Sequence, residues 1–246
     1  MASGASTITS TPVTVVRPPR WVGTHCQPAG RSAGALHSLL PAAIPAETGP
    51  VASLFENLRA AYPWFSGQWG DLETRWQRLE VPAGAVLLSE GEVSRRAFLV
   101  EKGCLRVWFN RRGRDVTAQF FFENQVVSSI ESFRSGQPSL FTIETLEPSV
   151  VWSISRAQFE EVQREARKDA ATLGFLLDAA YDRQIHYMRL FLSFIRDRPE
   201  ERYRRLVQEQ PQIVSRVPQR YIASYLGITP ESLSRIRARL ARSGRS

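Results

Sequence analysis

Apolar residues near the C-terminal end of the chain recur at helical spacing in two neighbouring segments. The first segment, residues 219–226, places Ile222, Ala223 and Leu226 on one face, as in an amphipathic helix. Gly227 follows directly, and glycine adopts the left-handed conformation at a helix end without steric penalty. The pattern therefore predicts a helix that ends in a tight turn.

A second helix is predicted to begin directly after this turn. Thr229 can accept a hydrogen bond from a free backbone N–H, Pro230 suits the first helical position, and Glu231 favours the positive end of the helix dipole. Two helices with this turn, the second with outward-facing arginines, favour a helix-turn-helix; the alternative is an ordinary helical hairpin with solvated arginines. The apolar face of the second helix comprises Leu233, Ile236 and Leu240.

Between residues 75 and 154 the pattern changes to short apolar or alternating runs separated by turn residues. Glycine occupies many of the breaks, and the sequence RRGR at residues 111–114 predicts a hairpin turn between two runs. Many short strands at this spacing are typical of a β-sandwich or β-barrel. The runs are WQRLEV, AVLL, AFLVE, CLRVWF, DVTAQFFF, QVV, LFTIETL and SVVWSI.

Two helices are predicted after these strands, a short one at residues 156–165 and a long one at residues 169–198. The long segment carries two apolar stripes, and the first has the spacing of a coiled-coil seam. We expect this seam to pair with the same helix of a second chain; the alternative is a single buried helix. Residues 197–200 are the predicted hinge to the C-terminal helices. The seam comprises Leu173, Leu177, Ala180, Gln184, Tyr187 and Phe191, and the second stripe comprises Tyr181, Ile185, Met188, Leu192 and Ile195.

Composition indicates a chain that can bury a core, because 43% of its 246 residues are hydrophobic. The net charge of +8 is concentrated at one end: ten arginines and three glutamates give residues 201–246 a net charge of +7. Such a local basic patch is the electrostatic feature expected of a module that contacts phosphates.

Residue counts exclude several classes of site. The two cysteines, Cys26 and Cys104, are too few for a disulfide scaffold or a four-thiolate iron–sulfur site, and the three histidines are too scattered to suggest a metal-ligand pair. We therefore expect no metal, no cofactor and no catalytic residues. No run of about twenty apolar residues is present, so no membrane-spanning helix is expected. The predicted location is the reducing cytoplasm.

The first fifty residues show no lasting periodicity and are rich in Ser, Thr, Pro, Ala and Gly. We expect a disordered extension or a start codon placed too far upstream. The basic, acid-poor composition is also that of a transit peptide, but no proper hydrophobic signal region is present. A short helix is predicted next, from Leu54, Phe55 and Leu58.

The segment RVPQRYIASYLGITPESLSRIRARL closely resembles the DNA-binding helices of the Crp/Fnr superfamily of bacterial transcription regulators. Recognition helices of this family often begin Glu-x-x-Ser-Arg, and Glu231, Ser234 and Arg235 occupy those places. The resemblance implies that Glu231 accepts a hydrogen bond from a cytosine amino group and that Arg235 donates two hydrogen bonds to guanine O6 and N7. It also implies that Ser234 helps to contact a TGA-containing half-site. Some members carry a further base-contacting arginine where this chain has Pro230, so that contact is in doubt. Expected backbone contacts are Arg220, Thr229, Arg237, Arg239 and Arg242.

The resemblance extends upstream to about Leu54. The order SEGE, FLVEKGCLRVWF and a glycine-containing hairpin is similar to the double-stranded β-helix of cyclic nucleotide-binding domains. The implied fold class is α+β: a jelly-roll barrel, a long dimerisation helix, and a helical winged-type helix-turn-helix domain that lacks most of the wing, because the chain ends at Ser246. The expected division is an extension at 1–50, a sensing domain at 51–168, the dimerisation helix at 169–198 and the DNA-binding domain at 199–246.

Binding of cyclic AMP is not expected. Members of the superfamily that bind it hold the ribose and phosphate with a Gly-Glu pair and, some ten residues later, an Arg-Ser or Arg-Thr pair. Here Ser128-Ser129 and Pro138-Ser139 stand near those positions, so the phosphate would lack a cation. Glu131 or Arg134 could substitute, although an exposed loop is the favoured interpretation. The candidate pocket for another small molecule comprises Ser128, Ser129, Glu131, Arg134 and Ser139.

These observations predict a homodimeric DNA-binding transcription regulator that responds to a ligand other than cyclic AMP or to none. The expected partners are double-stranded DNA with a twofold-symmetric site, a second copy of the chain, RNA polymerase and an unknown small-molecule effector. The alternative hypothesis is a small-molecule-binding module whose basic tail contacts RNA or an acidic protein. A cupin-type enzyme is not expected, because residues 71–155 contain no histidine.

Overall fold

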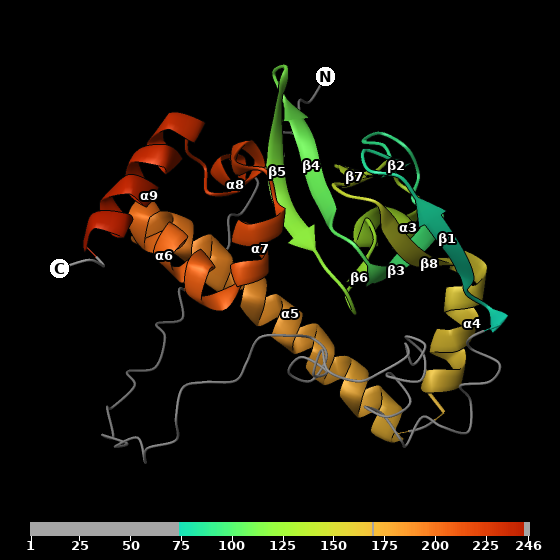
Figure 1. Cartoon of the computed structure of the whole chain (residues 1–246). Coiled ribbons are helices and arrows are strands. Elements are labelled where there is room, and N and C mark those ends of the chain that lie inside the picture. Colours follow the sequence, from blue (N-terminus) through green and yellow to red (C-terminus); the bar gives the residue numbers. More distant parts are fainter. Residues whose placement is uncertain (1–73, 169, 244–246) are drawn as a thin grey trace, which may run out of the picture. The chain divides into compact units, whose positions relative to one another are not determined.

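The computed structural model describes residues 74–168 and 170–243 (Figure 1). The first range holds the strands and the second range is helical. The predicted extension at residues 1–50 and the short helix expected after it lie outside the described residues. An antiparallel β core followed by several helices confirms the predicted α+β class in its general form.

In the described part of the chain, two antiparallel four-stranded sheets face each other, with the orders β1-β8-β3-β6 and β2-β7-β4-β5. Each predicted run corresponds to one strand, because the alternation of apolar and polar residues fixes which face of a strand is buried. The strands are β1 (Gln77–Val81), β2 (Val86–Leu88), β3 (Arg96–Lys102), β4 (Leu105–Arg111), β5 (Arg114–Phe121), β6 (Val126–Val127), β7 (Thr142–Thr145) and β8 (Ser149–Ser155).

The inner faces of the two sheets enclose an apolar core. On β4, Leu105 and Val107 belong to this core, whereas Arg106 between them lies on the outer face and contacts the C-terminal helices. Ile143 of the paired strand β7 is fully buried in the same cluster. Because side chains alternate across a strand, the pattern that builds the core also decides which residues the outer face presents.

The turn between β3 and β4 requires glycine. Gly103 has a φ of 117°, and a Cβ at this position would lie 2.1 Å from Ser149 Oγ. The Gly103 N–H donates to the Glu123 carboxylate at 2.9 Å. This turn therefore holds Glu123 on the side of the barrel that meets the C-terminal helices.

The helices agree with the sequence pattern where apolar periodicity or caps are strong. The predicted segments correspond to α4, α5, α8 and α9, whereas α3, α6 and α7 were not predicted. Because α6 begins at Pro199, the predicted hinge at residues 197–200 is reduced to a break at Asp197 and Arg198. The helices are α3 (Ile130–Ser135), α4 (Arg156–Ala166), α5 (Ala170–Arg196), α6 (Pro199–Glu209), α7 (Pro211–Arg216), α8 (Gln219–Tyr225) and α9 (Pro230–Ser243).

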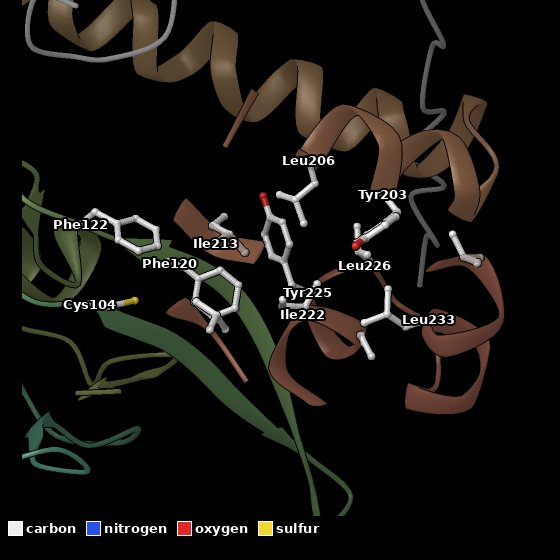
Figure 2. Packing of buried hydrophobic residues seen from close by; sticks show 13 residues of the cluster. Cys104, Phe120, Phe122, Tyr203, Leu206, Ile213, Ile222, Tyr225, Leu226 and Leu233 are labelled. Atoms are coloured by element: carbon white, nitrogen blue, oxygen red, sulfur yellow. The ribbon is translucent and has the colours of Figure 1, made fainter. Parts of the chain in front are cut away.

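The C-terminal end of strand β5 is buried on both faces. Phe121 belongs to the core inside the barrel, whereas Phe120 and Phe122 belong to a second cluster shared with the C-terminal helices (Figure 2). In that cluster the rings of Phe120 and Tyr225 have centroids 5.4 Å apart, and Ile213 of α7 is buried beside them. One continuous apolar cluster therefore joins the barrel to α6, α7, α8 and α9.

The long helix α5 turns one face to its own barrel and exposes another. The Tyr187 hydroxyl donates to Gln119 of β5 at 2.8 Å, and Arg183 donates to the Val126 carbonyl at 3.3 Å. Tyr187, which the sequence placed in the seam with a second chain, thus contacts its own barrel. The exposed apolar residues share one broad side of the helix and combine both predicted stripes. This α5 stripe comprises Leu173, Leu177, Tyr181, Ile185, Met188, Phe191, Leu192 and Ile195.

Candidate nucleic-acid interface

Helix α9 buries one side and exposes the other. Leu233 and Ile236 are buried, whereas Glu231, Arg235 and Arg242 are exposed. The exposed residues stand at i, i+4 and i+11, so at 3.6 residues per turn they share the side opposite the buried pair. Two of the three predicted base-contacting residues therefore lie next to each other on one surface.

A groove of about 700 Å³ runs along the contact between α9 and α6. Ser234 and Arg237 line this groove together with Tyr203 and Val207 of α6. Ser234, predicted to contact a base, and Arg237, predicted to contact the backbone, are both exposed but lie toward this groove. The two residues therefore flank the outer side of α9 that carries Glu231.

The first turn of α9 is capped by Thr229. Its Oγ1 accepts a hydrogen bond from the Ser232 N–H at 3.2 Å. Hydrogen bonds from its own backbone N–H and from Thr229 hold the pKa of Glu231 below its ordinary value, and the charge of Arg235 acts in the same direction. Glu231 is therefore ionised at neutral pH and offers only acceptors, as a contact with an amino group requires.

Several arginines of the basic C-terminal region have structural partners. Arg239, a predicted backbone contact, forms an ion pair with Glu200 of α6 at 2.7 Å. Arg202 donates to the carbonyls of Asp197 and Leu226 at 2.8 and 2.9 Å, which ties α6 to the end of α8. Fewer positive charges of residues 201–246 are therefore available to bind a polyanion than the net charge of the sequence indicates.

Arg220, another predicted backbone contact, is exposed at the start of α8. It donates to the Tyr221 hydroxyl at 2.9 Å, and its Cζ lies 4.6 Å from the centroid of the Tyr221 ring. This stacking positions the guanidinium while leaving its other donors available.

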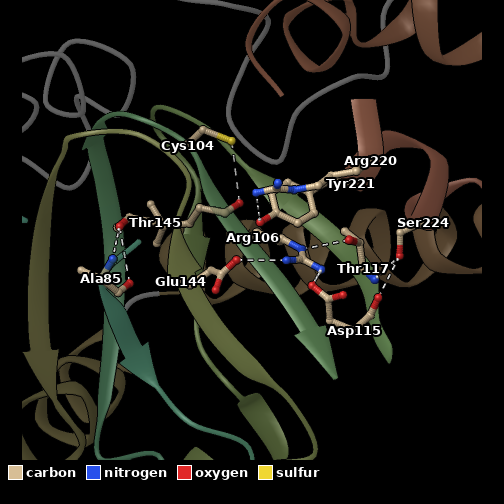
Figure 3. Close-up of polar contacts among 11 residues, drawn as sticks. Ala85, Cys104, Arg106, Asp115, Thr117, Glu144, Thr145, Arg220, Tyr221 and Ser224 are labelled. Atoms are coloured by element: carbon tan, nitrogen blue, oxygen red, sulfur yellow. Dashed lines mark hydrogen bonds and ion pairs between the residues drawn. The ribbon is translucent and has the colours of Figure 1, made fainter. Parts of the chain in front are cut away.

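Arg106 of β4 is the most deeply buried charged residue of the contact between the barrel and α8, with an exposed fraction of 1%. Its donors meet Asp115 at 2.7 Å, Glu144 at 3.0 Å and the Thr117 hydroxyl at 2.9 Å (Figure 3). The Tyr221 ring of α8 covers the guanidinium, with its centroid 3.8 Å from Cζ. A buried guanidinium requires paired donors, and β5, β7 and α8 together satisfy this requirement.

A second polar contact joins α8 directly to the β5 backbone. The Thr117 N–H donates to Ser224 Oγ at 2.9 Å, and Ser224 Oγ donates to the Asp115 carbonyl at 3.3 Å. The Ser224 side chain therefore forms hydrogen bonds with the backbone of the edge strand β5 (Figure 3). These bonds fix the place of α8 along β5.

A third contact joins α7 to the barrel through Arg216. Its two Nη atoms donate to the Glu123 carboxylate at 2.9 and 2.8 Å, and Nη2 also contacts Glu147. Burial disfavours the charged Glu123 carboxylate, but the hydrogen bonds from Arg216 and Gly103 prevail and hold its pKa below the ordinary value. Arg216, counted in the basic patch of the sequence, is thus a tether between α7 and the barrel.

The predicted ligand residues lie in the segment around α3 and before β7. Ser139 is buried and donates to the Phe141 carbonyl at 2.7 Å, while Ser129 is buried at the start of α3. Ser128 is half-buried. Glu131 and Arg134 are exposed, but they lie on helix α3 and not on the loop that the sequence favoured.

Sequence reasoning missed Ser132 in the same segment. This buried hydroxyl accepts from the Ser94 N–H at 2.8 Å and donates to the Gln137 carbonyl. No periodic or motif signal marks a serine that closes a loop in this way.

The described residues offer little to metal or thiol chemistry. Burial raises the pKa of the Cys104 thiol to about 12, and the nearby Glu147 charge adds to the effect, so this thiol is protonated at neutral pH. Nowhere in residues 74–168 and 170–243 do three or more His, Cys, Asp or Glu side chains gather as metal ligands. None of the helices described there combines the length and apolar character that a membrane crossing requires.

Comparison with known proteins finds one family model that matches part of the chain. Residues 78–166 match the model of the cyclic nucleotide-binding domain. A search among curated proteins finds no match.

Several solved structures have a similar fold. The c-di-GMP-responsive regulator CLP of Xanthomonas campestris is 15% identical, with 73% of this chain and 93% of CLP covered and a TM-score of 0.59. FixK2 of Bradyrhizobium japonicum is 19% identical, with 69% and 86% covered and a TM-score of 0.55. A CooA variant from Carboxydothermus hydrogenoformans is 15% identical, with 79% and 87% covered and a TM-score of 0.58. At these identities the likeness establishes a common fold.

Replacing Glu123 with glutamine tests the charged tether between α7 and the barrel. We expect E123Q to lower the melting temperature at pH 7 by about 2 to 4 °C, because a half-exposed bidentate pair with Arg216 contributes about 1 kcal/mol. Since folding lowers the Glu123 pKa, this contribution is complete above the ordinary value of 4.5 and is lost as the pH falls through the lower folded value. Thermal unfolding of both proteins from neutral pH to about pH 3 measures the difference.

The matched control is E160Q, which removes an exposed carboxylate that pairs with Arg156 within α4. We expect a smaller loss from E160Q, because exposed pairs one helical turn apart contribute about 0.3 to 0.5 kcal/mol. A deficit of E123Q that stays constant down to about pH 3 would show that the charge of Glu123 is not what holds α7.

Proposed function

Since residues 78–166 match the model of the cyclic nucleotide-binding domain and several solved structures that share this fold are regulators of the Crp/Fnr type, we propose that the chain is a sequence-specific DNA-binding transcription regulator. In this proposal the sensing domain comprises residues 51–168, the dimerisation helix comprises residues 169–198 and the DNA-binding domain comprises residues 199–246. The observation that carries the proposal is the outer side of α9, where Glu231 and Arg235 are exposed one turn apart. RNA polymerase is the expected further partner.

In this function α9 enters the major groove of double-stranded DNA, which admits an α-helix. Glu231 accepts a hydrogen bond from a cytosine amino group, and Arg235 donates two hydrogen bonds to guanine O6 and N7. Arg235 Nη2 also donates to Ser232 Oγ at 3.2 Å, a long bond that orients the guanidinium and leaves most of its donors free. Arg220 and Arg242 contact phosphates on either side and carry no sequence preference.

The proposed dimer forms through the α5 stripe. Tyr181, Ile185, Met188, Leu192 and Ile195 each have an exposed fraction of at least 45%, and an apolar row of this length on a long helix fits the same row of a second copy. A twofold axis along α5 would present two copies of α9 to two half-sites, which a twofold-symmetric DNA site requires.

The proposed effector is a molecule other than cyclic AMP, or there is none. The segment that would hold a cyclic phosphate has Pro138 and Ser139 where an arginine is needed, and the Ser139 and Ser132 hydroxyls already donate to backbone carbonyls. A buried phosphate without a cation is strongly disfavoured. CLP responds to c-di-GMP, so cyclic dinucleotides belong in any screen for an effector.

Two arginine variants separate base contacts from backbone contacts. We expect Arg235→Ala to relax selection at one base pair in each half-site and to cost about 1 to 3 kcal/mol, because alanine cannot form the bidentate hydrogen bonds to guanine. We expect Arg242→Ala, the matched control on the same side of α9, to weaken all sequences alike. Selection from a random duplex pool, followed by affinity measurements, distinguishes them.

Equal selectivity before and after Arg235→Ala would remove the basis for the assignment of α9. Association that ignores salt concentration and the shape of the duplex would instead favour a module that contacts RNA or an acidic protein.

A charge placed in the α5 stripe tests the dimer. We expect Met188→Glu to give monomers in analytical ultracentrifugation, because a carboxylate in an apolar seam loses its hydration without gaining a partner. Arg189→Glu is the control, because Arg189 is an exposed residue outside the stripe and its variant introduces the same carboxylate. A dimer that survives Met188→Glu, or a wild-type chain that is monomeric at high concentration, rules out this seam.

Thermal unfolding with added nucleotide tests the effector assignment. A ligand present at 100 times its Kd stabilises a protein by about 2.7 kcal/mol, which corresponds to roughly 5 to 10 °C for a chain of this size. We expect cyclic AMP to shift the melting temperature by less than about 1 °C, because no cation faces the phosphate. A saturable shift of several degrees with cyclic AMP would overturn this expectation.

A further inference from the structure

The hairpin between β4 and β5 ends in three arginines, Arg111, Arg112 and Arg114, which we call the arginine tip. All three are exposed, and none of their side chains forms a hydrogen bond or ion pair with another described residue. The acid next to them, Asp115, is held by Arg106 at 2.7 Å. Positive charge is therefore gathered at the end of the hairpin, where no ion pair with a described acid neutralises it.

The turn that carries the arginine tip is tight and well defined. Arg112 and Gly113 have φ values of 53° and 80°, and positive φ at both central positions is the mark of a type I′ hairpin turn. The Gly113 N–H donates to Asn110 Oδ1 at 3.0 Å, and the Asn110 N–H donates to Glu90 at 2.8 Å. The turn thus fixes the positions from which the three arginine side chains extend.

Two features of the arginine tip work against the stability of the hairpin. Arg111 and Arg114 face each other across the strands, and like charges in directly opposite positions destabilise a sheet. Arg112 occupies a left-handed conformation, where asparagine or glycine is favoured. Residues that destabilise the local fold are expected at functional sites. Stability therefore does not explain why arginines occupy these three positions.

The hairpin is attached to α8 close to its turn (Figure 3). Ser224 bonds the β5 backbone at Thr117 and Asp115, and Tyr221 covers Arg106 on β4. Asp115 directly follows Arg114, so a rise of about 3.4 Å per residue leaves the end of the hairpin within roughly 10 Å of α8. The arginine tip is therefore held beside the first helix of the proposed helix-turn-helix.

We propose that the arginine tip contacts the phosphate backbone of DNA next to the half-site occupied by α9. The inference rests on the proposed function, because the first helix of a helix-turn-helix crosses the DNA backbone and a basic hairpin bound to that helix lies close to the phosphates. Arg220 at the start of α8 extends the same basic surface. The barrel thereby adds a non-specific anchor to the specific contacts of α9.

Duplex phosphate is favoured over an acidic protein as the occupant because the hairpin is bonded to α8, the helix whose exposed Arg220 is proposed to contact the DNA backbone. The Tyr221 ring contacts the guanidinium groups of both Arg220 and Arg106, so the backbone-contacting side of α8 and the hairpin share one aromatic side chain. A partner bound to the tip would therefore lie against the same side of α8 as the DNA.

The test compares two variants of the full chain that each remove three positive charges. The tip variant is R111Q/R112N/R114Q, in which asparagine preserves the left-handed turn. The control variant is R95Q/R164Q/R167Q, which neutralises exposed arginines near α4 at a distance from the hairpin. Thermal unfolding checks that both variants fold, and affinity for a selected duplex is measured over a range of salt concentrations.

We expect the tip variant to reduce the slope of log K against log salt by about 0.9 for each phosphate that the protein no longer neutralises, or roughly fivefold in affinity per phosphate at 0.15 M salt. The base preferences selected by the wild type should remain unchanged, and the difference from the wild type should disappear on a duplex trimmed to the two half-sites. The control variant should retain the wild-type slope apart from a small change shared by all duplexes.

Each outcome decides one question. A tip variant that matches the control in slope and affinity overturns the inference and leaves the tip free for an acidic protein. A wild-type chain that binds no duplex selectively removes the proposed function itself, whereas Arg235-dependent selection with an unaffected tip variant removes only the inference. Loss of base preference in the tip variant would also contradict it, because phosphate contacts carry no sequence information.

Discussion

The arrangement of barrel and C-terminal helices depends on one buried guanidinium, that of Arg106. Without partners a buried charge costs several kcal/mol, and here Asp115 and Glu144 supply opposite charge while Tyr221 excludes water. The two carboxylates belong to the barrel and the ring belongs to α8. If α8 leaves, Asp115 and Glu144 therefore still neutralise the Arg106 guanidinium. Water can then solvate the three exposed ions, Arg106, Asp115 and Glu144. The polar half of this contact therefore fixes the position of α8 without making its departure prohibitive.

The apolar half opposes separation. Phe120 and Phe122 share a buried cluster with Tyr225 and with apolar residues of the other C-terminal helices. Exposing apolar surface costs about 25 cal/mol per Å². Against this, the indole N–H of Trp108 and Nε of Arg202 are buried without partners among the described residues, and each such donor costs about 1 to 3 kcal/mol. A signal in the barrel can move α8 only by changing this balance, because a ligand shifts an equilibrium by its differential affinity for the two states.

The sequence predicts those elements whose own residues carry the signal. Strands follow from alternation, and α9 follows from Thr229, Pro230 and a regular apolar face. Helix α6 escapes prediction because only Tyr203 and Leu206 are buried in it and charged residues surround them. The candidate site divides in the same way: motif spacing finds Glu231, Ser234 and Arg235, whereas long-range contacts such as the Arg216 tether leave no local trace.

Arginine does two kinds of work in this chain, and the proximity of an acid decides which. Arg216 and Arg239 belong to the basic stretch of the sequence, yet Glu123, Glu147 and Glu200 from other elements neutralise them in the fold. The arginines on the outer side of α9 and at the tip of the β4–β5 hairpin form no ion pair with an acid among the described residues, although Glu231 lies near Arg235. Folding therefore converts a diffuse positive charge into a directed one, because paired arginines hold the modules together and unpaired ones generate the field that a polyanion meets.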